Sequence, residues 1–233
     1  MIQYLIDHPD KILMPLMETV ELTLATLVIS VALAALLTIL AVKFPRLGYA
    51  LIQLFSMIYS IPSLAVFALL IPLTGLGKET AVIVLVIYNQ YLLLRNFVTG
   101  ISEVDPAVVE AARGIGLTDM QTLFKVQVPL AKAALYAGIR LAVVSTIGIS
   151  TIASAINAGG LGDLLFDGLR TMNMIKVLWG SLLSAGLAIL VNGLLKSVEN
   201  YSSRKMKEGG SSRRMISPFT FRTITKEMTA HVE

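Results

Sequence analysis

The chain has 233 residues, of which 55% are hydrophobic and only 15% are charged, whereas about 25% of the residues of an ordinary soluble domain are charged. A chain of this composition cannot cover itself with polar surface, which excludes a soluble globular domain. It contains no cysteine, so disulfides, thiolate metal sites and a cysteine nucleophile are excluded as well. We interpret the net charge of +4 as a record of membrane orientation and not of nucleic-acid binding.

Apolar runs near the length that crosses a hydrocarbon core, about 20 residues, predict an all-α membrane protein with about five transmembrane helices. The predicted spans are residues 22–42, 47–73, 80–100, 133–156 and 177–195. Pro62 lies near the middle of the second span and should kink it. The third apolar run ends at Arg95, and it crosses the membrane only if its helix continues to about Gly100.

The placement of basic residues predicts that the N-terminus lies outside and the C-terminus in the cytoplasm. In this arrangement 14 of the 19 lysines and arginines are cytoplasmic. Residues 1–20 then form an extracytoplasmic segment without a cleaved signal peptide. Residues 201–233 form a basic, mobile tail that either binds anionic headgroups or only enforces orientation.

The segment between the third and fourth spans is too long for a simple connection, and it carries helix signals. Asp105 is suited to cap a helix that starts at Pro106 and ends near Arg113. Gly114 and Gly116 should stop that helix. Thr118 and Gln121 have capping-box spacing for a second short helix, which should end where Pro129 turns the chain. The first helix should expose Val108, Val109, Ala111 and Ala112 beside Glu110 and Arg113. Such an apolar surface edged with charge suits a groove in a partner.

This loop resembles the coupling loop of the permeases of binding-protein-dependent ABC importers. The resemblance rests on the following residues and their spacing: Glu110, Ala111, Ala112, Gly116, Val126, Val128 and Pro129. Two aliphatic positions are valine here instead of the isoleucine and leucine of the family pattern. The resemblance implies that these residues transmit the motion of an ATPase, and the alternative is an ordinary amphipathic loop.

Three further runs are similar to the osmoprotectant branch of these permeases, which imports glycine betaine, carnitine or choline. They are residues 61–65, residues 94–101 and the glycine-rich run 158–164. An amino acid such as methionine, or another small thiol- or amine-bearing solute, stays an alternative cargo. The resemblance also implies that the chain lies in the plasma membrane of a bacterium. The partners that it implies are two ABC ATPase subunits that hold ATP and magnesium, a second permease copy or paralogue, and an extracytoplasmic binding protein.

Several polar and aromatic residues within the spans are candidates for the solute path. They are Tyr59, Pro62, Tyr88, Asn89, Arg140, Thr146, Ser150 and Ser154. The alternative for the hydroxyl and amide side chains is close helix packing. For Arg140, taken as the only ionisable residue within a span, the alternative is snorkelling or a structural hydrogen bond.

Other functional classes find little support in the sequence. The predicted spans lack Asp, Glu and His, the groups that a proton-coupled secondary transporter normally keeps in the membrane. A secondary transporter or a channel is therefore the remoter alternative. No phosphate-binding loop occurs, and His8 and His231 lie near opposite ends of the chain. We expect no enzyme activity, cofactor or metal in this chain.

Overall fold

The computed structural model describes residues 9–211, and within this range it is helical throughout, without strands. Four helices are long and apolar enough to cross a membrane. They are α2 (Asp10–Lys43), α5 (Lys78–Ser102), α9 (Lys132–Ala153) and α11 (Met174–Ser211). A bent pair, α3 (Pro45–Tyr59) and α4 (Ser63–Thr74), is the candidate for a fifth span. The predicted all-helical membrane protein is confirmed.

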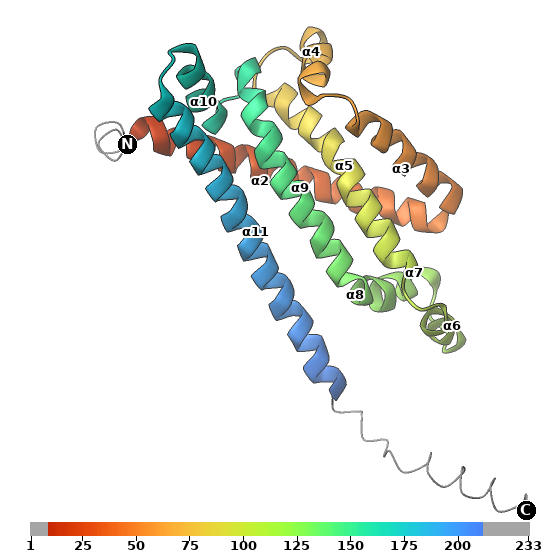
Figure 1. Ribbon diagram of the computed structural model, residues 1–233. Coiled ribbons are helices and arrows are strands. Elements are labelled where there is room, and N and C mark those ends of the chain that lie inside the picture. The colour runs from red at the N-terminus through yellow and green to blue at the C-terminus, as the bar shows by residue number, and fades with distance from the viewer. Residues whose placement is uncertain (1–8, 212–233) are drawn as a thin grey trace, which may run out of the picture.

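Helix α5 lies at the centre of the bundle and packs against both α2 and α9, which also contact each other. Helix α3 contacts α2 and α5, whereas α11 packs along α9 (Figure 1). Of the four long spans α5 is the most enclosed, with 56% of its most apolar stretch buried. Few residues of α5 are therefore exposed on the surface of the single chain.

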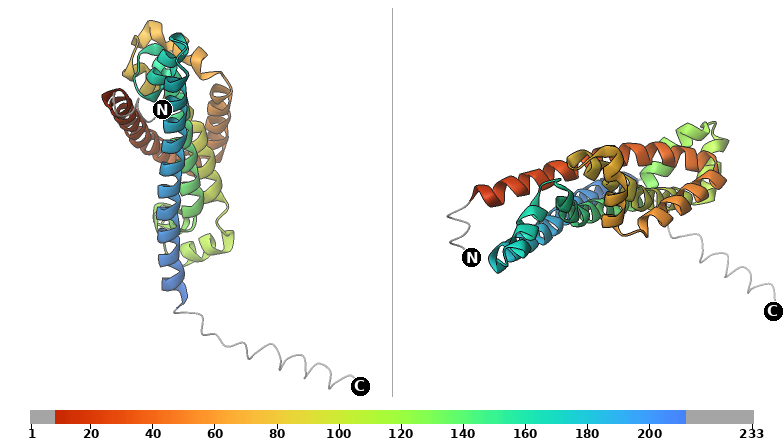
Figure 2. Two further views of the ribbon diagram at one scale, coloured as in Figure 1. Left: turned by 60° about the vertical axis from the view of Figure 1, so that its left-hand side comes forward. Right: turned by 90° about the horizontal axis from the view of Figure 1, so that it is seen from above.

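Short helices gather at the two ends of the bundle. At one end lie α4 and α10 (Leu161–Arg170), which follows the 3-10 turn Ser154–Ile156. At the opposite end lie α6 (Pro106–Gly114), α7 (Asp119–Thr122), a π-helical segment (Leu123–Gln127) and α8 (Val128–Leu130). Figure 2 shows the same separation from a second side. We refer to these as the α10 end and the α6 end.

The second predicted span is broken, not merely kinked. Helices α3 and α4 meet at 97°, because Pro62 is extended (φ −55°, ψ 129°) and has no N–H to continue the helix. The Tyr88 hydroxyl donates a 2.5 Å hydrogen bond to the carbonyl of Ile61, which satisfies one of the carbonyls freed at the break. Helix α4 therefore lies across the α10 end and does not continue the direction of α3.

Two helices extend beyond their predicted spans. Helix α2 begins at Asp10, so residues 10–20 continue a membrane helix where we predicted a separate segment. Helix α11 runs to Ser211, so residues 201–211, predicted as mobile tail, are helical. The remaining residues of that predicted tail, 212–233, lie outside the described residues, as do residues 1–8.

Helix α2 meets the bundle through a stripe of small, mostly hydroxyl side chains. Its buried positions include Thr19, Thr23, Thr26, Ser30, Ala34 and Thr38. Small side chains allow close approach of helices in a membrane, where burying apolar surface gives no advantage over lipid. One of these hydroxyl groups, that of Ser30, accepts a hydrogen bond from the Asn89 amide on α5.

Candidate functional site

Helix α6 is closed at both ends by local signals in the sequence. The Asp105 side chain accepts a 2.9 Å hydrogen bond from the backbone N–H of Ala107, and Pro106 occupies the first helical position. At the other end, Leu117 N–H bonds to Ala112 O at 3.2 Å and Gly116 N–H to Arg113 O at 2.9 Å. This pair of bonds is a Schellman motif with Gly116 at the left-handed position, at φ +89°. The predicted cap and the glycine stop are confirmed.

The two alanines of the resemblance motif face opposite ways. Ala112 is buried, with 6% exposed, whereas Ala111 and Glu110 are exposed. Val109, on the same helix, packs against a cluster formed by Ile101, Val104, Leu123 and Ala131. The prediction that Ala112 is exposed to a partner is therefore wrong. Ala112 lies on the face of α6 that packs against the rest of its own chain, and Ala111 lies on the outward face.

The second short helix begins as predicted but ends differently. Thr118 and Gln121 form a reciprocal capping box. The helix then widens into π geometry, in which Val128 N–H bonds to Leu123 O, five residues back. A proline ring conflicts with the carbonyl four residues before it in an α-helix, and for Pro129 that carbonyl belongs to Lys125. We attribute the π segment to this conflict. The chain stays helical through Leu130, so Pro129 does not end the helix as predicted.

The outward face of this loop carries exposed apolar side chains beside charge. Val108, Ile115, Met120 and Phe124 are 41%, 81%, 52% and 52% exposed. Arg113 pairs with Asp119 at 3.0 Å, with both side chains largely exposed. Val126, Val128 and Pro129 are half-buried behind them. Residues 106–130 thus form a compact unit at the α6 end with an exposed apolar surface, and we call this unit the plug.

Most candidates for the solute path are buried within a single chain. Asn89 Nδ2 on α5 donates to Ser30 on α2 at 3.2 Å and to Thr146 on α9 at 2.9 Å. Ser150 and Ser154 donate to the carbonyls of Ile147 and Gly159. These bonds join helices or satisfy backbone groups, as the packing alternative requires. A role of these residues in the path stays a prediction.

Arg140 forms an ion pair with Glu199. Its guanidinium lies 2.9 Å from a carboxylate oxygen of Glu199 on α11, and the two side chains are only 25% and 17% exposed. The pair joins α9 to α11 and favours the structural alternative for Arg140. Tyr88 is buried and Pro62 is exposed at the break before α4.

The α10 end holds a junction that the sequence did not reveal. Glu18 on α2 accepts a 2.8 Å hydrogen bond from Gly160 N–H, and Thr19 accepts one of the same length from Leu161 N–H. Gly160, at φ +91°, lets the backbone reach these side chains. Helix α10 is therefore capped by residues 142 positions earlier in the chain. Burial, reinforced by the Glu18 carboxylate, raises the pKa of the nearby Asp163.

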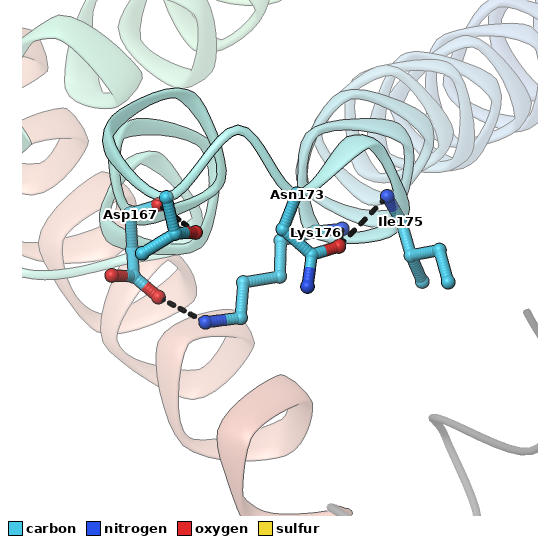
Figure 3. Close-up of polar contacts among 5 residues, drawn as sticks. Asp167, Asn173, Ile175 and Lys176 are labelled. Carbon is cyan, nitrogen blue, oxygen red and sulfur yellow. Dashed lines mark hydrogen bonds and ion pairs between the residues drawn. The ribbon is translucent and has the colours of Figure 1, made fainter.

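Helices α10 and α11 form a braced hairpin. Lys176 donates a 2.5 Å hydrogen bond to Asp167, and Asn173 caps α11 by accepting from the N–H of Ile175 at 3.0 Å (Figure 3). The bond from Lys176 lowers the pKa of Asp167. Gly168 lies so close to Val177 that an added Cβ would be 2.7 Å from its backbone nitrogen. The hairpin and the junction with Glu18 thus fix the α10 end.

Arg95 lies well inside a long helix. The hydropathy pattern made it the end of an apolar run, but α5 continues to Ser102, about 10 Å further at 1.5 Å per residue. The expectation that Arg140 is the only ionisable residue within a span is therefore wrong. The signal was available, since the predicted span 80–100 already included Arg95.

In the part of the chain that the structure describes, no group of three or more His, Asp or Glu side chains is arranged to hold a metal.

Residues 29–208 match the family model described as binding-protein-dependent transport system inner membrane component. The carnitine transport permease protein OpuCB of Listeria monocytogenes is 33% identical over 208 residues, 88% of this chain and 95% of that protein. The choline transport system permease protein OpuBB of Bacillus subtilis is 32% identical over 212 residues, with 91% and 96% covered.

A solved structure supports the fold independently. A chain of the MetNI methionine ABC transporter in an inward-facing crystal form superposes with a TM-score of 0.76 over 82% of this chain and 95% of that chain, at 19% identity. At this identity the likeness concerns the fold alone. The family itself is shown by the match over residues 29–208 and by the two permeases named above. The chain belongs to the family of inner membrane components of binding-protein-dependent transport systems.

Proposed function

We propose that this permease imports a small quaternary-amine osmoprotectant, such as glycine betaine, carnitine or choline. The observation that carries the proposal is similarity over nearly the full length to permeases named for carnitine and choline. The chain supplies the membrane path and the lever, and two copies of a separate ATPase subunit, which hold ATP and magnesium, supply the energy. A binding protein outside the membrane delivers the solute, and a second permease copy or paralogue completes the path.

The plug at the α6 end is the proposed contact with the ATPase. It stands outside the long spans and exposes Ile115, Met120 and Phe124. Exposed apolar side chains next to charge suit a groove in a protein partner. Closure of the two ATPase subunits would move this plug, and the attached ends of α5 and α9 would transmit the motion along the bundle. The path would thereby open alternately to the two sides of the membrane.

Uptake measurements test the cargo. Deletion of the gene for this chain should reduce uptake of labelled glycine betaine, carnitine or choline in cells without other importers for these solutes. Restoring the gene is the control, and it should restore uptake. If none of the three solutes is affected while methionine uptake falls, the proposed cargo is wrong and the amino-acid alternative replaces it.

Orientation is a further part of the proposal. Basic residues such as Lys43, Arg113 and Lys125 lie toward the α6 end, which we assign to the cytoplasm. Since the chain has no cysteine, single cysteines can report sidedness. A cysteine at Lys78, at the α10 end, should react with an impermeant thiol reagent in intact cells, and one at Asp119 should react only after lysis. The reverse pattern would refute the orientation.

A further inference from the structure

Arg95 is an exposed cation within the most enclosed span. It lies seven residues before the end of α5 at Ser102, roughly 10 Å inside the helix end. Charged side chains inside a membrane span almost always face the interior of a bundle or a water-filled cavity, because lipid cannot solvate them. Arg95 is exposed on its own chain. The side chain therefore either extends to the headgroups or faces a bundle interior or a water-filled cavity.

The direction of the side chain argues against snorkelling. Nη1 of Arg95 donates a 2.7 Å hydrogen bond to the hydroxyl of Tyr91, and the guanidinium carbon lies 5.9 Å from the centre of that ring. Tyr91 is one turn further from the nearer end of α5. The guanidinium thus points into the span, whereas a snorkelling arginine extends toward the nearer headgroups. This direction holds whichever side of the membrane the α6 end occupies.

The charge of Arg95 is also uncompensated. Among the ion pairs of residues 9–202, none involves Arg95, whereas Arg140 is paired with Glu199. A guanidinium has five N–H donors, and the bond to Tyr91 uses one. The remaining donors are free to bind a planar anion such as a carboxylate, which arginine can hold through two parallel bonds.

Aromatic rings adjoin this cation on the same side. The ring centre of Tyr59, on α3, lies 5.1 Å from that of Tyr91 and 5.6 Å from that of Tyr88. Tyr59 and Tyr91 are only partly buried. Thr99, one turn beyond Arg95, is exposed as well. Aromatic faces attract quaternary ammonium groups, so this strip carries partners for both ends of a zwitterion.

We propose that Arg95, together with the rings of Tyr91 and Tyr59, forms a station in the solute path for a zwitterion with a carboxylate and a quaternary ammonium group. Arg95 binds the carboxylate, and the rings lie against the ammonium group. This inference rests on the proposed function. It narrows the proposed solutes to those with a carboxylate, which choline lacks. A single arginine on an exposed face holds the solute weakly, which suits a path from which the solute must leave.

The test compares substrates in the complete importer, reconstituted with its ATPase and binding protein. Arg95→Gln should lower uptake of carnitine and glycine betaine by about tenfold or more relative to uptake of choline, as expected for a lost charge-assisted contact. Arg95→Lys should retain an intermediate rate for the two carboxylates. A general loss of structure would lower the uptake of all three solutes alike, so the ratio separates binding from folding.

Two further variants serve as comparisons. Arg46→Gln removes an exposed arginine from the start of α3 and should leave the ratio at its native value. Tyr91→Phe removes the internal bond of Arg95 but keeps the charge and the ring, so its loss of carboxylate uptake should be smaller than that of Arg95→Gln. If the importer accepts no choline, the comparison of Tyr91→Phe with Arg95→Gln tests the station instead. Equal losses of carboxylate uptake in the two variants would show that Arg95 has a structural role only.

The outcomes separate the station from the proposed function. If the native importer takes up none of the three solutes, the proposed function fails. If it takes up carboxylates and Arg95→Gln leaves their uptake unchanged, or lowers choline uptake equally, the station is refuted while the function stands. Uptake of choline alone by the native importer would likewise refute the station.

Discussion

Gly116→Val should reduce uptake by the reconstituted importer to less than about a tenth of the native rate, because valine strongly disfavours a positive φ. Gly116 has φ +89° and holds the left-handed position of the motif that ends α6. Its added Cβ would meet no atom within 4 Å, so the backbone conformation and not a steric clash causes the effect. The plug would change shape, and the ATPase should co-purify weakly.

A glycine two residues earlier provides a matched control. Gly114 also has open space around an added Cβ, but its φ is not positive. Gly114→Val should therefore leave most of the uptake intact. Both variants should insert into the membrane normally, since neither residue lies in a long span. Native uptake and normal ATPase association in Gly116→Val would show that this loop is not the coupling element.

Local signals in the sequence predicted the loop well. The cap at Asp105, the stop at Gly116 and the capping box at Thr118 each involve residues within a few positions of one another. Such short-range hydrogen bonds depend little on the rest of the fold. The π segment escaped prediction, although Pro129 was visible, because a proline can end, kink or widen a helix and neighbouring contacts decide which.

Contacts between distant segments could not be predicted from the sequence. The break at Pro62 became a near-right angle with Tyr88 bonded to the freed carbonyl of Ile61. The capping of α10 by Glu18 and Thr19 joins residues 142 positions apart. The sequence marked Arg95 as the end of an apolar run within the predicted span 80–100. Its bond to Tyr91, and the contact of Tyr91 with Tyr59 on α3, could not be predicted. Candidate path residues such as Asn89 could be named but not assigned to packing or to the path.

The glycine-rich run before α10 was recognised in the sequence as a motif, but the structural role of its glycines was not. Gly159 and Gly160 have positive φ, and an added Cβ at these positions would lie 2.6 Å from Glu18 and 2.7 Å from Thr19. Gly162 has ordinary helical backbone but packs directly on the carbonyl oxygen of Thr151 and the hydroxyl of Ser154. The first two glycines thus serve the junction with α2, and the third serves the junction with α9.

Gly162→Ala should destabilise the purified protein in detergent by about 1–3 kcal/mol, the range for overpacking a closely packed site. The methyl group would meet a backbone oxygen, Thr151 O, which cannot rotate away. Helix α10 would have to shift, and its bonds to Glu18 and Thr19 would lengthen. The midpoint of thermal unfolding, followed by the loss of monodisperse protein, measures the effect.

The control for this variant is Gly186→Ala on α11, where an added Cβ meets no atom within 4 Å and alanine favours the helix by roughly 0.5–1 kcal/mol. Its unfolding midpoint should stay the same or rise. Thr19→Val, which removes the acceptor for Leu161 N–H, should also lower the midpoint. Combined with Gly162→Ala it should add less than the sum of the two single effects, because both act on the same junction. A native midpoint for Gly162→Ala, or strict additivity with Thr19→Val, would mean that α10 is not held by this junction.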